Sequence, residues 1–329
     1  MFLMTSSFCV DKKFFLLIFV ILLIGFFSVI YKINSKNLTY KTKASTPQIF
    51  GGQPADPGEW PFVVVLYDKT LFGKGIIGTL KNTQFCTGFL ISNSWVITAA
   101  HCLYKKEGDF SKLFVYNKFD KKSNDFIGVA VGFDNINTTK VGQKQALRDI
   151  EGYVIYEGFN YKYRYKNTLD FSEYKDMRVF HNDDIALIRI KPLDDSVNFK
   201  TISITNDKNL IVPTTYVEIL GWGYTEKAKP DVLYEGINKI DSNRRSNNNI
   251  IVNEITIIDS AARPNQGDSG GPMLTYNNNE WFAIGIASSE NSGLPQSYYT
   301  NLIEHYPWIN LVTKIEEGQG SFIGKSPEW

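Results

Sequence analysis

From residue 49 onward, short runs of β-branched and aromatic residues are repeatedly interrupted by glycine, asparagine, aspartate and serine. Such runs are typical of β-strands, because their side chains fit a pleated, half-buried surface and the interrupting residues favour turns. The clear runs are Phe62–Tyr67, Phe89–Ile91, Trp95–Thr98, Ile185–Ile190, Tyr216–Leu220, Ile250–Ile258 and Trp281–Ile286. No long helical periodicity lies between them, so the sequence predicts an all-β body built as barrels or sandwiches.

The C-terminal segment has a different pattern. Pro307 suits the first position of a helix, because the amide hydrogen that proline lacks is not used there. Trp308, Leu311, Val312 and Ile315 then fall on one face of such a helix. We therefore expect a C-terminal helix after the β body, whereas residues 103–182 show a less regular pattern.

Composition excludes several classes of protein. With 43% hydrophobic and 21% charged residues, the chain is too apolar to be largely disordered. A net charge of +1 gives no electrostatic basis for nucleic-acid binding. The basic aromatic run Tyr161–Lys166 is accordingly interpreted as a solvated loop rather than a nucleic-acid contact. The three cysteines and three histidines show no metal-ligand spacing, so we expect neither a metal nor a cofactor.

The N-terminal segment has the character of a membrane anchor. Phe14–Tyr31 carries no charge and is about 27 Å long as a helix, close to one hydrocarbon core. Lys12 and Lys13 precede it, as expected for a cytoplasmic flank. We predict a signal-anchor helix that holds the rest of the chain outside the cytoplasm; a cleaved signal peptide followed by secretion is the alternative. The predicted parts are a cytoplasmic N-terminus (1–13), the transmembrane segment (14–31), a linker or propeptide (32–48), the β domain (49–315) and a tail (316–329).

Three short segments carry groups with catalytic chemistry. Ser269 lies in the glycine-rich run Gly267–Pro272, where a tight turn can leave backbone N–H groups facing a substrate oxygen. Serine is a poor nucleophile unless a base and an orienting acid activate it. His101 is a candidate base, and Asp183 or Asp184, just before a predicted strand, is a candidate acid. Each segment alone is commonly structural, but the order His, Asp, Ser matches one known triad arrangement.

Longer motifs surround these residues. They are Ile49–Gly52, Pro57–Phe62, Phe85–Ile91, Trp95–Cys102 and Gly221–Gly223. With them the chain, from Ile49 to about Ile315, resembles the trypsin/chymotrypsin family of serine endopeptidases. The resemblance implies two six-stranded antiparallel barrels, with the active site in the cleft between them. It also implies hydrolysis of peptide bonds in protein or peptide substrates through an acyl-enzyme intermediate.

The resemblance gives each site residue a role. Ser269 attacks the scissile carbonyl and His101 transfers the proton. Asp184, rather than Asp183, orients His101, because the aspartate of the family directly precedes the Ile-Ala-Leu run. The backbone N–H groups of Gly267 and Ser269 form the oxyanion hole.

A disulfide and an activation step are also implied. Cys86 and Cys102 fit the family's disulfide beside the catalytic histidine, which requires an oxidising compartment. A cut between Gln48 and Ile49 frees an amine that pairs with Asp268 and orders the oxyanion loop. Many relatives have Arg or Lys before this bond, so the glutamine argues against a trypsin-like activating protease.

The specificity pocket departs from the family's trypsin-like pattern. Arg263 occupies the position where trypsin-like members have Asp, while Ser288 and Glu290 lie on the strand that lines the pocket. A cationic pocket base disfavours Lys or Arg and favours an acidic side chain or glutamine before the scissile bond. Two alternatives remove the basis for this preference: Glu290 neutralises Arg263, or Arg263 points to solvent.

The resemblance thus predicts an active serine endopeptidase, and the alternative is a catalytically inactive, protease-like binding module. All three triad residues are present together with Asp268, which favours the enzyme. The expected partners are a protein or peptide substrate, an activating protease or an inhibitor, and the membrane through the N-terminal helix. No nucleic-acid partner is expected.

Overall fold

A computed structural model provides the structure of the chain. It describes residues 49, 51–75, 78–103, 126–163, 179–225, 228–241, 254–258, 262–290 and 296–314. The predicted membrane segment Phe14–Tyr31 lies outside the described residues. Among the described residues, no helix has the length and apolar character needed to cross a membrane.

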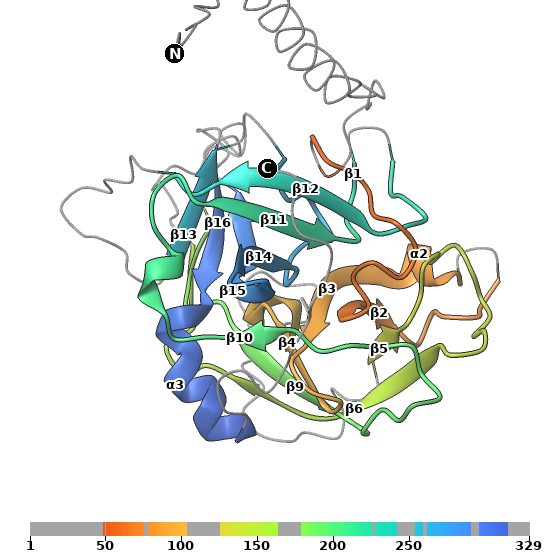
Figure 1. Cartoon of the computed structure of the whole chain (residues 1–329). Coiled ribbons are helices and arrows are strands. Elements are labelled where there is room, and N and C mark those ends of the chain that lie inside the picture. The colour runs from red at the N-terminus through yellow and green to blue at the C-terminus, as the bar shows by residue number, and fades with distance from the viewer. Residues whose placement is uncertain are drawn as a thin grey trace, which may run out of the picture. The chain divides into compact units, whose positions relative to one another are not determined.

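Strands dominate the described residues (Figure 1). They are β1 (Gln53–Pro54), β2 (Val63–Asp68), β3 (Gln84–Leu90), β4 (Trp95–Thr98), β5 (Ile127–Val131), β6 (Ala146–Ile155), β7 (Asn160–Tyr163), β8 (Val179–Asn182), β9 (Ala186–Ile190), β10 (Ser203–Ile204), β11 (Tyr216–Gly221), β12 (Tyr234–Lys239), β13 (Glu254–Ile258), β14 (Pro272–Asn277), β15 (Glu280–Glu290) and β16 (Gln296–Asn301). The helical elements are α2 (Leu80–Thr83), the 3-10 turns η1 (Ala100–Leu103) and η4 (Lys208–Leu210), and α3 (Leu302–Thr313). The expected β character of the body is confirmed.

Six of these strands close a barrel in the order β2-β3-β4-β9-β6-β5. Every neighbouring pair in it is antiparallel. The residues from Val63 to Tyr67 in β2 are all buried, so both faces of this strand are covered. Phe62, Phe89 and Ile97 are fully buried in the same core. The barrel is therefore a packed core that holds its connecting turns in place.

The second half of the body is a wider sheet rather than the expected second six-stranded barrel. Its strands follow the order β1-β12-β11-β14-β15-β16-β13, and β10 adds to β15 in parallel. The short strands β1 and β10 extend the sheet, and no pairing between β1 and β13 closes it within the described residues. Only one of the two predicted barrels is therefore found as a closed barrel.

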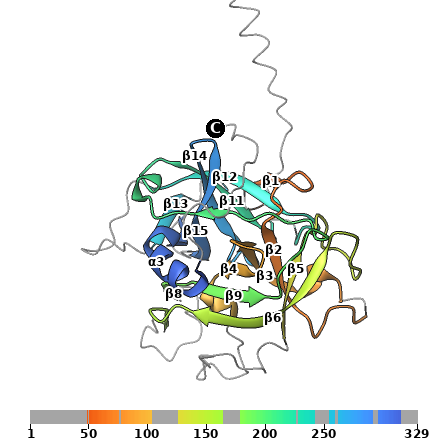
Figure 2. The ribbon, with the colours of Figure 1, turned by 60° about the horizontal axis from the view of Figure 1, so that its bottom comes forward.

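The C-terminal helix is present, but it begins at Leu302 rather than at Pro307. The side chain of Asn301 accepts a hydrogen bond from the N–H of Ile303 and caps the helix. Pro307 lies inside the helix, where it cannot donate the usual backbone bond. Because of this earlier start, His305 and Ile309 are buried, whereas Leu311 is 65% exposed. Figure 2 shows α3 at the side of β15.

The region 103–182 contains strands that sequence reasoning missed. β5 and β6 are both barrel strands. Arg148, Asp149 and Glu151 interrupt the apolar pattern of β6; Asp149 and Glu151 are exposed at the barrel wall, whereas Arg148 is half-buried. The run Tyr161–Lys166 begins in β7 and then leaves the described residues.

The barrel core leads to a prediction about stability. Phe62→Ala should lower the free energy of unfolding by about 3–5 kcal/mol, because it leaves a cavity among fully buried side chains. Phe126→Ala is the matched control, since Phe126 is 38% exposed, and should cost about 1 kcal/mol or less. Guanidinium unfolding followed by tryptophan fluorescence measures both. Equal losses would contradict this description of the core.

Candidate active site

His101 lies in the short turn η1, directly after barrel strand β4. A disulfide between Cys86 and Cys102 ties this turn to β3, with the two Cα atoms 6.1 Å apart. The histidine side chain is 20% exposed, whereas Ala99 and Ala100 before it are fully buried. The barrel and the disulfide together fix the backbone that carries His101.

Asp184 lies just before barrel strand β9, and its carboxylate is completely buried. Its Oδ2 lies 2.6 Å from Nδ1 of His101, and its Oδ1 accepts the backbone N–H of His101 at 2.9 Å. The hydroxyl of Ser288, on β15, donates to Oδ2 at 2.7 Å. Thr300, on β16, donates its hydroxyl to the backbone carbonyl of Asp184 at 3.1 Å. Both halves of the body therefore hold this aspartate.

Asp183 has a different environment from its neighbour. Its Oδ1 lies 3.1 Å from Nε2 of His305 on α3. The geometry thus distinguishes the two candidate acids: Asp184 contacts His101 and Asp183 contacts His305.

The Asp184 carboxylate changes the proton affinity of His101. Burial by itself lowers the pKa of the ring, but the negative charge of Asp184 and its hydrogen bond act the other way. The pKa of His101 is raised above 6.5 as a result. The bond to Nδ1 leaves Nε2 as the ring nitrogen that can exchange a proton with a substrate or nucleophile.

Strand β3 holds the loop that carries Ser269. The N–H of Thr87 donates to the carbonyl of Ser269 at 2.8 Å. The Thr87 hydroxyl donates to the carbonyl of Gly267 at 2.9 Å, and the amide of Gln84 donates to the same oxygen at 2.8 Å. The loop needs glycine at Gly270, because its φ is +84° and a Cβ there would lie 2.1 Å from Oγ1 of Thr98.

The backbone of this loop presents two N–H groups. The carbonyl of Gln266 accepts from the N–H of Tyr224 at 2.8 Å, so it is turned toward Tyr224. Neither the N–H of Gly267 nor that of Ser269 donates to another group of the described residues. These two donors are accordingly available to an oxygen atom placed beside Ser269.

The disulfide lies between Ser269 and His101. Sγ of Cys102 lies 3.6 Å from the carbonyl oxygen of Ser269 and 3.9 Å from Nε2 of His101. No hydrogen bond joins the Ser269 hydroxyl to His101 in the described part of the chain. The backbone of Ser269 and the ring of His101 thus lie against the same sulfur atom, without the direct hydrogen bond that a base makes to a nucleophile.

Asp268 is a second buried carboxylate, with 2% of its surface exposed. Its Oδ1 accepts the N–H of Gly223 at 2.6 Å, and its Oδ2 accepts the N–H of Asn265 at 2.8 Å. A Cβ at Gly221 or Gly223 would lie within 2.6 Å of this carboxyl group, which explains why glycine flanks Trp222. Ile49 is also buried, against the core of the second sheet.

A cavity of about 280 Å³ opens beside Ser269. It is lined by Pro264, Asn265, Gln266, Ser269, Ala287, Ser288 and Ser289. Arg263 is not among the described residues that line it, and the side chain of Glu290 lies outside the described residues. The described lining is thus uncharged and mixes amide and hydroxyl groups with the apolar Pro264 and Ala287.

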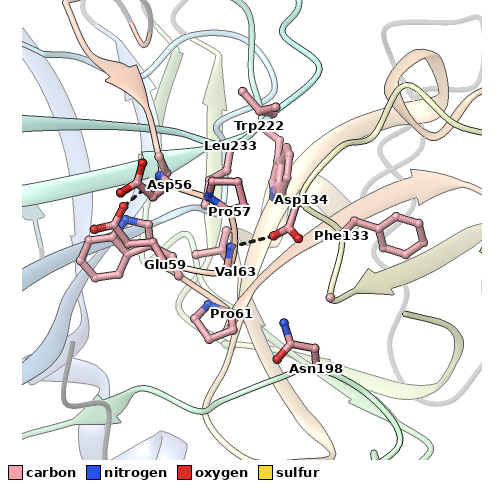
Figure 3. Close-up of a pocket in the computed structure, with 15 residues that line it drawn as sticks. Asp56, Pro57, Glu59, Pro61, Val63, Phe133, Asp134, Asn198, Trp222 and Leu233 are labelled. Carbon is pink, nitrogen blue, oxygen red and sulfur yellow. Dashed lines mark hydrogen bonds between the residues drawn. The ribbon is translucent and has the colours of Figure 1, made fainter. Parts of the chain in front are cut away.

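A second cavity lies away from Ser269, beside Asp134 and Trp222 (Figure 3). Its volume is about 40 Å³, too small for a peptide side chain of any length. Cys86, His101 and Cys102 bring potential metal ligands within 4.8 Å of one another. Both sulfurs are joined in the disulfide, so they offer no thiolate to a metal.

Comparison with known proteins identifies the fold family. The sequence model of the trypsin family matches residues 49–309. The chain belongs to the trypsin family. It is also similar to the mouse (Mus musculus) protein named transmembrane protease serine 11C, with 25% identity over 283 residues. The similar region is 82% of this chain and 54% of the mouse protein, so the chain spans about half the length of that relative.

In this trypsin-family domain, several supporting residues were missed or only partly predicted from the sequence. Ser288 lines the cavity beside Ser269 and also donates to Asp184, a contact that the sequence does not indicate; its role in specificity stays a prediction. Gln84 and Thr87 were not predicted to hold the Ser269 loop, because nothing near them in the sequence indicates it. The position of His305 in the sequence gives no sign of its contact with Asp183.

The His101–Asp184 pair predicts a measurable change in titration. Asp184→Asn should lower the pKa of His101, because burial lowers this pKa and the variant loses the negative charge that, together with the hydrogen bond, outweighs burial. Asp183→Asn is the matched control and should change this pKa little. The chain has three histidines, so NMR of ¹³C-histidine-labelled protein can follow each one. A comparable fall with both variants would contradict the assignment of Asp184.

Proposed function

We propose that this trypsin-like peptidase domain is an active serine endopeptidase. The observation that carries the proposal is the buried Asp184–His101 pair beside a Ser269 loop with two available N–H donors. A histidine paired with a buried aspartate is common in proteins. Such a pair next to a serine whose loop offers two free backbone N–H donors is the arrangement that serine nucleophiles use in catalysis. Membership of the trypsin family gives the reaction class, which is peptide-bond hydrolysis.

In the proposed mechanism, Ser269 Oγ attacks the scissile carbonyl carbon while His101 Nε2 takes the hydroxyl proton. The carboxylate of Asp184 stabilises the imidazolium that forms. His101 then gives this proton to the leaving amine, the C–N bond breaks, and the acyl group remains on Ser269. A water molecule attacks the ester, with its proton passing to His101, and the acid is released from the restored serine.

The backbone donors of Gly267 and Ser269 serve in this mechanism as the oxyanion hole. They would donate to the carbonyl oxygen when it gains negative charge in the tetrahedral intermediate. The hydrogen bonds from Gln84 and Thr87 to the Gly267 carbonyl support this role, because they hold the loop before substrate arrives. Loss of one such donor typically costs about 10²–10³ in turnover.

The proposed base also sets a direction for pH dependence. His101 accepts a proton only when it is neutral, and its pKa is raised above 6.5 by Asp184. Activity should therefore fall on the acid side of this raised pKa and be retained above it.

Activation is proposed to follow a cut between Gln48 and Ile49. The new ammonium group would pair with Asp268, whose buried carboxylate lies next to Ser269. The buried Ile49 side chain supports this, because its position in the second-sheet core keeps the new terminus near the domain interior. We propose that residues 49–315 form the protease domain and 14–31 its membrane anchor. The name of the mouse relative, a transmembrane protease, supports an anchored or released extracellular enzyme.

The uncharged cavity beside Ser269 suggests the side chain that it accepts. Asn265, Gln266 and Ser289 offer amide and hydroxyl groups there, and no carboxylate lies among the described lining residues. A buried Lys or Arg would lack a charge partner in such a cavity. We propose a preference for glutamine before the scissile bond, which these groups can satisfy by hydrogen bonds, and for an acidic residue with Arg263 as its charge partner.

A fluorophosphonate probe tests the proposed mechanism directly. The chain beginning at Ile49 should be labelled at Ser269, as located by mass spectrometry, because the probe reacts only with an activated serine. Ser269→Ala should abolish labelling. Asp268→Asn should lower the labelling rate at least about tenfold, because the new N-terminus loses its charge partner. A folded domain that is not labelled would indicate the inactive, protease-like binding module instead.

A matched set of peptides tests the specificity. The peptides would differ only in the residue before the scissile bond: Gln, Glu, Lys or Arg. We expect kcat/KM for Gln or Glu to exceed that for Lys or Arg at least about tenfold, which is typical of one well-placed polar contact. Cleavage mainly after Lys or Arg would contradict the proposed pocket chemistry and leave the triad intact.

A further inference from the structure

A lysine beside the Ser269 loop has no carboxylate partner. Lys229, in the segment between β11 and β12, is partly buried, and its Nζ donates to the backbone carbonyl of Gln84 at 2.5 Å. The same atom lies 5.6 Å from the centre of the exposed Tyr224 ring. No ion pair joins Lys229 to an aspartate or glutamate in the part of the chain that the structure describes. Its charge thus contacts neutral groups.

The proton affinity of Lys229 reflects this environment. Nζ of the neighbouring Lys81, on α2, is paired with Asp231 at 2.6 Å, whereas Lys229 is not paired with this aspartate. The pKa of Lys229 is lowered to about 8, first by burial and then by the charge of Lys81, while the charge of Asp268 acts in the opposite direction. A lysine whose charged form is disfavoured in this way is stabilised by a carboxylate placed beside it.

The proposed mechanism defines the side of Ser269 on which the second part of a substrate leaves. His101 Nε2 gives its proton to the leaving amine, so the amine must lie next to this nitrogen. Nε2 lies 3.9 Å from Sγ of Cys102, and the disulfide joins Cys102 to Cys86 on β3. The cavity assigned to the residue before the scissile bond is lined instead by residues of β15 and of the segment before Ser269. The chain after the scissile bond therefore leaves on the β3 side.

Lys229 lies within reach of that part of a substrate. Gln84, to which it donates, is the first residue of β3, and the Gln84 side chain donates to the carbonyl of Gly267 at 2.8 Å. This chain of two hydrogen bonds places the ammonium group on the order of 10 Å from Ser269. An extended peptide covers about 3.3–3.6 Å per residue, so three residues span a similar distance.

We propose that Lys229 is a specificity-determining residue that binds a glutamate or aspartate side chain within the first three residues after the scissile bond. The proposal rests on the proposed function, because it needs a peptide held at Ser269. The substrate carboxylate supplies the charge partner that Lys229 lacks within the chain. The Gln84 carbonyl and the Tyr224 ring already restrict the lysine side chain, so less conformational entropy is lost when the carboxylate binds.

A set of matched peptides tests this preference, with the full chain cleaved between Gln48 and Ile49 as the enzyme. The peptides share glutamine before the scissile bond and carry either glutamate or glutamine at the first, second or third position after it. At one or more of these positions, kcat/KM should be about two- to fivefold higher for the glutamate peptide, the range of charge pairs near a protein surface. Added salt should reduce this ratio, because it screens the charge pair.

Variants of Lys229 separate its charge from its position. Lys229→Gln should bring the ratio of kcat/KM between the glutamate and glutamine peptides to unity, and Lys229→Glu should bring it below unity. Lys229→Arg should retain the preference, because arginine also pairs with a carboxylate. Lys239→Gln is the matched control and should not change the ratio. Lys239 lies over the Tyr216 ring at 4.1 Å, at the opposite end of β11 from Gly221.

A purely structural role of Lys229 predicts a different result. If the lysine serves only to hold the carbonyl of Gln84, Lys229→Gln lowers kcat/KM for both peptides by the same factor and leaves their ratio unchanged. That result would overturn the proposal. A wild-type ratio of unity at all three positions would overturn it as well.

A binding measurement separates this inference from the proposed function. In the cleaved chain carrying Ser269→Ala, fluorescence anisotropy should show about two- to fivefold tighter binding of the glutamate peptide than of the glutamine peptide. Adding Lys229→Gln should remove the difference. A wild-type chain that neither cleaves peptides nor reacts with the fluorophosphonate would count against the proposed function, and the binding comparison would still decide the role of Lys229. Equal binding of the two peptides would overturn the inference alone.

A titration keeps the inference testable if Lys229→Gln does not fold. NMR of ¹³C-methylated lysines can follow Lys229 in the Ser269→Ala chain. Its titration midpoint, about 8 in the free protein, should rise when the glutamate peptide binds and stay unchanged with the glutamine peptide. A midpoint that the glutamate peptide does not move would contradict a direct contact between the two charges.

Discussion

The architecture depends on one buried carboxylate, that of Asp184. A charged group with no exposed surface is stable only when hydrogen bonds and a charge partner replace the lost water. Here the backbone and ring of His101 come from the barrel, and the hydroxyl of Ser288 comes from the second sheet. Because donors from both halves converge on this group, the two halves must pack correctly before the aspartate is satisfied. The same contacts orient the ring of His101, so stability and site geometry have a common origin.

A second buried carboxylate, Asp268, organises the serine loop in a related way. Its oxygens accept backbone N–H groups from Gly223 and Asn265, and its bulk leaves no room for a side chain at Gly221 or Gly223. Strand β3 holds the adjacent carbonyls of the loop from the other side. The loop is thus held on one side by hydrogen bonds from the barrel strand β3 and on the other by the bond between Asp268 and Gly223, just after β11. This placement of Ser269 depends on backbone contacts far more than on its own side chain.

Much of this organisation follows from the sequence, but its supporting contacts do not. The β-branched runs predicted several strands, because burial on a sheet leaves a local pattern that a single strand displays. The charged β6 was missed, because an irregularity between Ile150 and Gly152 breaks the alternation of buried and exposed positions along it. The early start of α3 at Asn301 depends on a cap that Pro307 obscured. The contacts of Ser288 and His305 join residues more than a hundred positions apart, and no local signal encodes such pairs.

The register of strand β9 also determines which of the two carboxylates, Asp183 or Asp184, reaches His101. Ala186 pairs with Thr98 on one side and with Ile155 on the other, so two neighbours fix the register of the strand. A slip by one residue would present Asp183 in place of Asp184, and it would also reverse the faces of the whole strand. Arg189, which now lies over the ring of Trp95 at the surface, would then be forced into the barrel core without a counter-charge. A molecule that folds with the wrong aspartate at its histidine is therefore also one that cannot close its barrel, so instability removes this error before a mispaired site can persist.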